Sequence, residues 1–356
     1  MLPLPFTFPE RPAVTHIRQH GARATRDSNA KRTQPMAGFE DQYVDIVDYI
    51  VRITDEIWID RAVGRIYETY DANCTIYSSY GAVRSVEEVV AATVGAIHSF
   101  PDEETQHLNV AWSGDEQQGF YTSHLGQTQA TNLGATLYGP ATGKRVSSRF
   151  CADCISRDNR IHTEGLVRDN GAVVRQLGLD LHETAQLVAD QPRLEVPIVS
   201  VPTRMDGQAP RKFYDMPNDT PSAWAEHHFG QMWNARRFEH VPFHYAHDAV
   251  AHWPGGRVAT GPRNISNLIV GLIASLPDAT VSVEHVSWSE ETDGVILAIR
   301  WLMEGTTRPG GMLGDVPGGK AVFVMGMSHM RFGDGYVVEE WTVFDEVGVL
   351  AQAYRA

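Results

Sequence analysis

Side chains that could exchange protons lie near the C-terminus, on segments whose residues alternate as in β-strands. Glu340 and Thr342 stand two residues apart in YVVEEWTVFD, so the strand period places both on one face. His252 lies in AVAHWP, and His329 lies in KAVFVMGMSHMRF. A carboxyl group in an apolar environment has a raised pKa, which suits it to proton transfer near neutral pH. We expect Glu340 and His252 to form an acid–base pair, with His329 as a further catalytic candidate; the alternative for Glu340 is an outward, solvated carboxylate.

Two other motifs have contexts that argue against their usual chemistry. GDVPGGK (314–320) has the glycine and lysine spacing of a phosphate loop, but Ala321 follows where a Ser or Thr would bind magnesium, and a strand comes next. Cys151 and Cys154 form a C-x-x-C within a strand, where residues three apart face opposite sides. We therefore expect a hairpin turn at the first motif and two buried thiols at the second.

Three histidines invite a metal hypothesis. His240 and His244 have the i, i+4 spacing with which a helix can present two ligands to one ion, and His247 follows. Pro242 interrupts this segment, and no carboxylate completes an obvious ligand set. We expect no metal site.

The composition is that of an ordinary globular protein and excludes several classes. The chain has 356 residues with 30 Lys and Arg against 44 Asp and Glu, a formal charge of −14, which argues against nucleic acid as the main partner. It lacks the run of roughly 18 apolar residues that a membrane helix needs. Three cysteines are too few for a disulfide framework, so we expect a reducing, cytoplasmic setting.

The N-terminal segment differs from the rest of the chain. Residues 1–35 carry six basic and two acidic side chains, several prolines and no sustained hydrophobic period. This pattern predicts a disordered basic extension over 1–38. We expect a chain that begins at Met36 to fold with unchanged cooperativity.

An internal repeat organises the remainder. SFPDEETQHLNVAWS (99–113) and SLPDATVSVEHVSWS (275–289) share Ser, Pro, Asp, Trp and Ser, and each pair has the same offset as Ser99 and Ser275. Gly143-Lys144 recurs as Gly319-Lys320 at this constant offset, and His329 falls opposite Asp153. The repeat predicts a duplicated domain at 39–182 and 215–356. The Pro-rich stretch 183–214 between the copies is expected to be a linker.

Each copy has the same predicted order of elements. Apolar residues at helical spacing come first, as in 43–57, followed by a short helix, a short strand and a third helix that Ser85 would cap. Long alternating strands then follow, with Asp334-Gly335 as a tight hairpin turn. Helices first and an antiparallel sheet afterwards indicate an α+β fold. Relative to Thr342, strand parity turns His329 to the opposite face unless a bulge intervenes.

Each copy resembles the cone-shaped α+β fold of nuclear transport factor two, in its SnoaL-like polyketide cyclase branch. The resemblance rests on the Pro-Asp before the first long strand, the Gly-Lys turn, the Asp-Gly hairpin, and the endings EEWTVFDEVGVLAQ (339–352) and TEGLVRDNGAVVRQLG (163–178). It implies two tandem cones, each a curved antiparallel sheet wrapped on helices around an apolar pocket, with acid–base chemistry and no cofactor. In the family an Asp three residues before the closing Asp moves the proton, and this chain has Leu166 and Thr342 there.

The resemblance also implies which residues line the pockets. His252 corresponds to a position that faces the pocket mouth in many relatives. The expected wall of copy two consists of Trp253, Trp301, Met303 and Thr342, and that of copy one of Tyr77, Tyr121, His124, Arg149 and Glu164. Copy two is the expected active copy, because copy one has no counterpart of His252.

These patterns predict a cofactor-independent acid–base enzyme, an isomerase, cyclase, dehydratase or hydrolase, that acts on a small, largely apolar organic molecule. The alternative is a non-catalytic small-molecule-binding or assembly module, which the missing family Asp favours. Single-domain relatives commonly pair through their outer sheet faces, so we expect an internal pseudo-dimer of the two copies, with Trp341 and Val343 in the contact. A homo-oligomer of the whole chain is left open.

Overall fold

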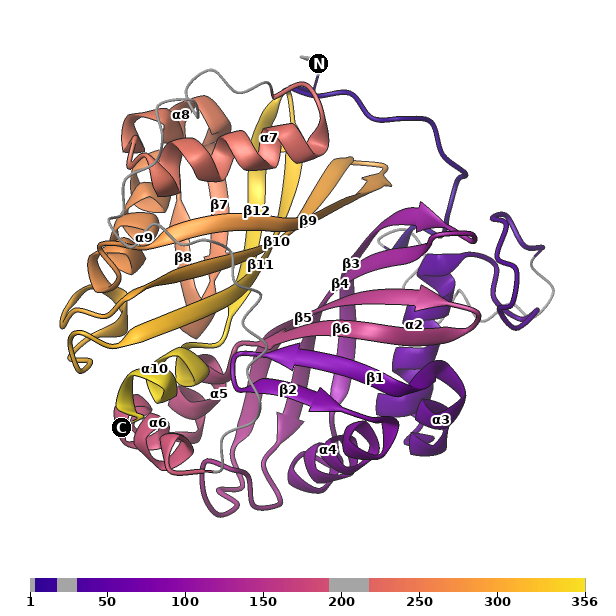
Figure 1. The fold of residues 1–356 in the computed structure, drawn as a ribbon, viewed down its shortest axis with the longest axis horizontal. Helices are drawn as coiled ribbons and strands as arrows, with labels where there is room; N and C mark the ends of the chain where they lie inside the picture. Colours follow the sequence, from indigo (N-terminus) through magenta and orange to yellow (C-terminus); the bar gives the residue numbers. More distant parts are fainter. Residues whose placement is uncertain (1–3, 18–30, 192–217, 356) are drawn as a thin grey trace.

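The computed structural model describes residues 4–17, 31–191 and 218–355, which form a mixed α+β molecule around a large sheet (Figure 1). Residues 31–191 are called the first half below, and residues 218–355 the second half. The first half contains α2 (Ile46–Trp58), η1 (Val63–Arg65), α3 (Ile66–Thr69), β1 (Tyr70–Ser78), β2 (Gly81–Arg84), α4 (Val86–Ser99), β3 (Glu104–Asp115), β4 (Gly119–Thr131), β5 (Arg145–Arg157), β6 (Arg160–Arg168), α5 (Asn170–Leu177) and α6 (Leu181–Ala189). The second half contains α7 (Pro221–His228), η3 (Phe229–Asn234), η4 (Phe238–His240), α8 (Val241–His244), β7 (Tyr245–Trp253), η5 (Pro254–Gly256), β8 (Arg257–Thr260), α9 (Pro262–Ser275), β9 (Thr280–Glu291), β10 (Gly294–Thr306), η6 (Gly311–Leu313), β11 (Ala321–Gly333), β12 (Tyr336–Phe344) and α10 (Glu346–Tyr354).

The strand order repeats about the centre of the sheet. Within the described ranges, twelve strands lie in the order β2-β1-β6-β5-β4-β3-β9-β10-β11-β12-β7-β8. Read outward from the centre, the first half has the order β3, β4, β5, β6, β1 and β2. The second half has the corresponding order β9, β10, β11, β12, β7 and β8. Inside each half the pairs are antiparallel except β1 with β6 and β7 with β12, which are parallel. The halves join through one paired position, Trp112 of β3 with Trp288 of β9.

Capping residues set where the helices begin. Asp45 accepts hydrogen bonds from two backbone N–H groups at the start of α2, and Ser85 caps α4 as the sequence predicts. Asp169 and Asp345 cap α5 and α10, the helices that follow the last strand of each half. In Figure 1 these two helices lie together with α6, so the end of each half packs against the other.

The two halves also pack through sheet faces. One apolar cluster combines side chains of both halves, namely Leu125, Cys151, Val167, Met325, Met327, Trp341 and Val343. The expectation that Trp341 and Val343 lie in such a contact is confirmed. Beside this cluster His329 accepts a hydrogen bond from Nδ2 of Asn109 (3.0 Å) and donates to Oγ of Ser123 (3.1 Å). His329 therefore faces the other half, as strand parity predicts.

The N-terminal segment corrects one expectation. Phe6 is only 3% exposed and belongs to the core of the second half, whereas Ile17 is buried in the core of the first. Met36 is buried as well. Disorder over 1–38 is therefore wrong for the described parts of this segment, 4–17 and 31–38. Isolated apolar side chains, too widely spaced to give a helical or strand period, dock separately onto the two cores.

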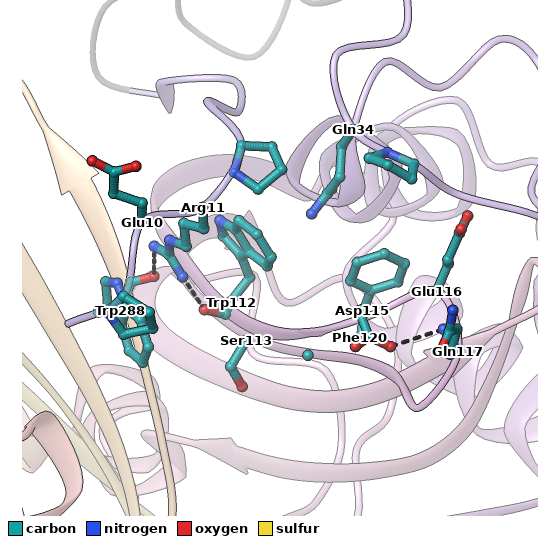
Figure 2. Close-up of a pocket in the computed structure, with 14 residues that line it drawn as sticks. Glu10, Arg11, Gln34, Trp112, Ser113, Asp115, Glu116, Gln117, Phe120 and Trp288 are labelled. Carbon is teal, nitrogen blue, oxygen red and sulfur yellow. Dashed lines mark hydrogen bonds between the residues drawn. The ribbon is translucent and has the colours of Figure 1, made fainter.

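Arg11 marks the middle of this N-terminal strap, defined as residues 4–17. Its guanidinium lies 4.2 Å from the ring centroid of Trp112 and 4.5 Å from that of Trp288 (Figure 2). It also donates hydrogen bonds to the backbone oxygens of both tryptophans, each at 2.5 Å. Such a planar cation can stack on aromatic faces and use its fork of donors at the same time. The strap thus covers the one position at which β3 and β9 pair.

The predicted linker also begins later than expected. Helix α6 (Leu181–Ala189) runs through the boundary predicted at residue 182 and packs against α10. Asp180 caps α6 by accepting from two backbone N–H groups. Residues 192–214 of the predicted linker lie outside the described residues.

Candidate functional site

A cavity of about 770 Å³ lies in the first half, between the sheet and helices α2 and α4. Its wall is mostly apolar and includes Ile50, Ile53, Ile57, Val89, Phe150 and Leu166. Side chains that can exchange protons also line it, among them Tyr70, Glu103, His124, Glu164 and Asp345. This size and this mixture are typical of pockets that enclose a small organic molecule.

Glu164 is the carboxyl group on the last strand of this half, β6. It is 7% exposed, and its Oε2 accepts a hydrogen bond from the hydroxyl of Tyr70 at 3.0 Å. Burial raises the pKa of Glu164, and the hydrogen bond from Tyr70 and the charge of Arg168 offset this only in part. The pKa of this carboxyl group is therefore shifted toward the neutral pH range, in which the group can donate or accept a proton.

His124 reaches the cavity at the end of a chain of hydrogen bonds. Nε2 of His107 lies 2.9 Å from Oδ1 of Asp55, and Nδ1 of His107 lies 2.8 Å from Nε2 of His124. The chain brings together α2, β3 and β4, and all three side chains are buried. Burial lowers the pKa of His124 well below its ordinary value, and His107 and His329 act in the same direction. His124 is therefore a neutral imidazole held in a fixed orientation.

A second polar group of the cavity comes from the second half. Asp345 caps α10 and accepts a hydrogen bond from Nδ2 of Asn170 at 2.5 Å. Asn170 also donates to the hydroxyl of Tyr80 at 3.3 Å, and Tyr80 interacts with Asp345 and Tyr138 through side-chain hydrogen bonds. Asp345, Asn170, Tyr80 and Tyr138 all line the cavity. Burial raises the pKa of Asp345 to about 6.

Asp169, which matches Asp345 in the first half, also has a raised pKa, and the two raised pKa values make the stability of the fold depend on pH. Burial raises the pKa of Asp169 to about 6, against 3.8 for an ordinary Asp. The folded state therefore binds protons at Asp169 and Asp345 between about pH 4 and 6, where the unfolded chain has released them. Stability from these groups is greatest below about pH 4 and is lost as the pH rises through about 6, on the order of 2–3 kcal/mol each.

Denaturant unfolding between pH 4.5 and 7.5 tests this pH dependence. The free energy of unfolding of the wild type should fall relative to that of the double variant D169N/D345N as the pH rises. A difference between the two proteins that stays constant over this range would contradict the expectation.

The second half holds the same carboxyl group in a filled interior. Glu340 is 2% exposed and accepts hydrogen bonds from the Tyr245 hydroxyl (2.6 Å), Nε1 of Trp253 (2.8 Å) and the Thr342 hydroxyl (2.5 Å). Its inward orientation beside Thr342 agrees with the prediction. Burial raises the pKa of Glu340, but its hydrogen-bond partners enclose it within the apolar core cluster. Trp253, Trp301 and Met303, which were expected to line a pocket, are at most 1% exposed and fill this core.

Matched positions explain why one interior is open and the other filled. Trp253 ends β7, whereas β1 ends in Ser78, which lines the cavity. Trp301 lies over Gly326, so close that a Cβ there would approach its ring to 2.1 Å. On the matching rung of the first half the bulky and small partners are exchanged, with Phe150 over Gly126. At three further matched positions the second half has a buried apolar side chain and the first half has a polar one that lines the cavity. These positions are Met303 and Thr128, Phe229 and Thr54, and Ile299 and His124.

The structure does not bring His252 and Glu340 together. His252 pairs with Trp341 across the parallel strands and stacks on its ring at 6.1 Å, so it lies on the face opposite Glu340. Its Nε2 is 3.5 Å from a carboxylate oxygen of Glu339. His329 lies between the halves, and burial lowers its pKa to about 3. Both expectations of catalytic imidazoles in the second half are therefore corrected, because the strand period turns these side chains away from the interior.

Three residues expected to line the first cavity lie elsewhere. Tyr77 packs against the apolar cluster between the halves, and the ring of Tyr121 lies 4.2 Å from that of His285. Arg149 is on β5 and is not part of the cavity wall; burial lowers its pKa, against the charges of Asp169 and Glu339. His124 and Glu164 do line the cavity, as expected.

Four functional candidates escaped the sequence analysis. Tyr70 is the first residue of β1, and Asp345 belongs to the second half. Asp55 and His107 hold His124 through the chain of hydrogen bonds. Asp55 and His107 are far apart in sequence, on α2 and β3. The sequence carried a signal for Asp345, which recurs in the repeat as Asp169, and for Tyr70, since Tyr245 begins the equivalent strand β7.

The described residues contain neither a candidate metal site nor a candidate membrane-spanning helix. Within 4–17, 31–191 and 218–355, no three or more His, Cys, Asp or Glu side chains are grouped so as to hold a metal ion. None of the helices in the same ranges combines the length and apolar character needed to cross a bilayer.

A comparison with known protein families finds a match in part of the second half. Residues 225–353 match the family model of the SnoaL-like polyketide cyclases. The chain contains a SnoaL-like domain. This SnoaL-like domain is the half with the filled interior, and the cavity lies in the half outside the match. No curated protein matches the chain.

Several solved structures resemble a part of the chain close in length to this SnoaL-like domain. They include a SnoaL-like protein from Jannaschia sp. CCS1 (20% identity, 38% of this chain and 92% of that protein, TM-score 0.34), IdmH from Streptomyces antibioticus (26%, 37% and 96%, TM-score 0.32) and a protein with a ketosteroid isomerase-like fold from Catenulispora acidiphila (16%, 35% and 88%, TM-score 0.29).

Proposed function

We propose that the chain is a tandem of two SnoaL-like domains that pair as an internal pseudo-dimer. The sequence repeat of constant offset, the strand order mirrored about β3 and β9, and the family match over 225–353 support this arrangement. The first domain ends with α6 and the second with α10, and each end helix packs against the partner domain. Contacts through outer sheet faces, such as those of Trp341 and Val343, support the pseudo-dimer.

The first domain, in this proposal, is a cofactor-independent acid–base enzyme for a small, largely apolar organic molecule. The observation that carries the proposal is one apolar cavity of about 770 Å³ lined by both Glu164 and His124. Both groups are buried. Burial lowers the pKa of His124 and raises that of Glu164, so it favours the neutral form of each side chain. An apolar wall would exclude water from the reacting atoms and strengthen their interactions with the substrate.

The hydrogen-bond chain assigns the protons. The Asp55 carboxylate only accepts, so Nε2 of His107 carries a proton and Nδ1 of His107 accepts from Nε2–H of His124. Nδ1 of His124 is then unprotonated and can take a proton from the substrate. The positive charge that results can be shared with His107 beside Asp55. Glu164, oriented by Tyr70, can return a proton to the substrate.

The second domain serves as a structural partner in this proposal. Its Glu340 has three protein hydrogen-bond donors, and aromatic side chains fill the space that a ligand would need. Its C-terminal helix α10 closes against α5 and α6 of the first domain.

One observation favours the alternative of a binding module without catalysis. Leu166 lines the cavity at the position where the family has its proton-transferring Asp, and a leucine moves no proton. The alternative predicts that the cavity retains a ligand unchanged, whereas the enzyme converts it.

Ligand capture tests the proposal. The full chain is exposed to a small-molecule extract, washed and denatured, and the released molecules are identified by mass spectrometry and counted per chain. We expect one largely apolar molecule per chain, which fresh protein then converts to a product of equal mass or one differing by water. Two molecules per chain would contradict the filled second domain, release without conversion would favour the binding module, and retention of none would contradict a ligand cavity.

A further inference from the structure

The cavity of the first half is completed by the second half. Asp345 and Arg355 line it, although both belong to the C-terminal end of the chain, far beyond α6 in sequence. They flank α10, which packs against α5 and α6. Asp345 is 3% exposed, so its contact with the cavity is internal to the molecule.

The carboxylate of Asp345 is not saturated by its protein donors. It accepts from the backbone N–H of Gly348 at 3.1 Å, from Nδ2 of Asn170 at 2.5 Å and from the hydroxyl of Tyr80. A carboxylate offers about four acceptor positions, so one donor more can be accommodated. Because Asp345 lines the cavity, a bound molecule can supply that donor.

The matching residue Asp169 provides an internal comparison. Asp169 also caps the helix after the last strand, accepting from the N–H of Ala172 at 3.0 Å. It also reaches the other half, where the backbone N–H of Gly255 lies 2.8 and 2.9 Å from its two oxygens. Gly255 stands two residues after β7, as Tyr80 stands two residues after β1. Asp169 thus shares the structural role of Asp345 but is not part of the cavity wall.

We propose that Asp345 is a specificity-determining residue of the first-half cavity, where it accepts a hydrogen bond from a hydroxyl group of a largely apolar ligand. Asn170, Tyr80 and Tyr138 orient the carboxylate, so the site selects hydroxylated molecules over hydrocarbons of the same shape. The inference rests on the proposed function of this cavity and adds that the second half supplies part of its recognition surface.

Binding of two matched probes to the full chain tests this. The probes are 2-naphthol and 2-methylnaphthalene, which differ by a hydroxyl in place of a methyl group. Their dissociation constants are measured at pH 7.5 for the wild type, D345N and D169N. Asn is a good helix cap, so both variants keep the start of their helix. We expect the preference for 2-naphthol to fall about tenfold in D345N, since a hydrogen bond to a charged acceptor becomes one to a neutral amide, and to persist in D169N.

The other possible results contradict either the role of Asp345 or the ligand cavity itself. An equal loss of preference in both variants would show that Asp345 acts only on the structure. Binding of both probes with an unchanged preference in D345N, or without any preference in the wild type, would overturn this inference and leave the proposed cavity standing. Failure of the wild type to bind either probe would overturn the ligand cavity and this inference together.

Discussion

Replacing Glu164 by Gln is expected to lower turnover of the cavity's substrate by about 10²- to 10⁴-fold, the usual contribution of a positioned general acid or base. The amide keeps the size of the side chain and can still accept the hydrogen bond from Tyr70, so the cavity retains its shape. What is lost is the proton that the carboxyl group exchanges. Steady-state kinetics with the ligand identified by capture measures the effect, and an unchanged dissociation constant shows that binding survives.

Glu340→Gln is the matched control, since Glu340 occupies the equivalent place in the filled half. Three donors point at its carboxylate, from Tyr245, Trp253 and Thr342, and an amide offers only one oxygen to them. We expect a loss of about 1–3 kcal/mol in the free energy of unfolding with turnover per folded molecule unchanged. Activity that survives E164Q and disappears in E340Q would mean that the second half is the active one.

Removing residues 1–17 is expected to destabilise the protein strongly. The deletion exposes the sites of Phe6 and Ile17, two buried apolar side chains worth about 1.5–3 kcal/mol each. It also removes Arg11 from between Trp112 and Trp288. The thermal midpoint should fall by at least about 5 °C in scanning calorimetry. The sequence-based expectation that a chain beginning at Met36 folds with unchanged cooperativity gives the opposite result, an unchanged midpoint.

Arg11→Lys separates the central contact of the strap from its two apolar anchors. Lysine keeps the charge but lacks the planar fork that reaches both tryptophan carbonyl oxygens. We expect a smaller fall of the midpoint than in the deletion, with Phe6 and Ile17 still docked. A midpoint as low as that of the deletion would assign the whole effect to Arg11.

The sequence predicts the architecture well because its signals are local or repeated. The constant offset between matched residues such as Ser99 and Ser275 predicts two units of the same element order, and the order of the strands is the same in both halves. Strand parity places Glu340 beside Thr342 and turns His329 away. Ser85 is recognised as a helix cap from its neighbours alone. The N-terminal strap escaped prediction because its apolar anchors act singly and have no period.

The choice of the open half could not be predicted in the same way. It depends on which side chains face each interior, as with Trp253 in the second half and Ser78 in the first, and these matches are known only once the strand register is fixed. The support of His124 likewise joins α2 to β3 and β4, which are distant in sequence. His252 was misplaced because its strand pairs in parallel with β12, opposite Trp341, and parity then directs it outward.

The exchange of bulky and small side chains between the halves has a consequence for how such a protein can change. In a dimer of identical subunits every substitution enters both cones at once, so an indole that fills one cone abolishes both active sites. In the proposed tandem, two cones encoded in one chain can differ in sequence. Ser78 and Trp253 can then differ, one cone keeping room for a ligand while the other gains a core of aromatic rings. Under the proposed function, one domain can then carry out the chemistry while the other stabilises the pair.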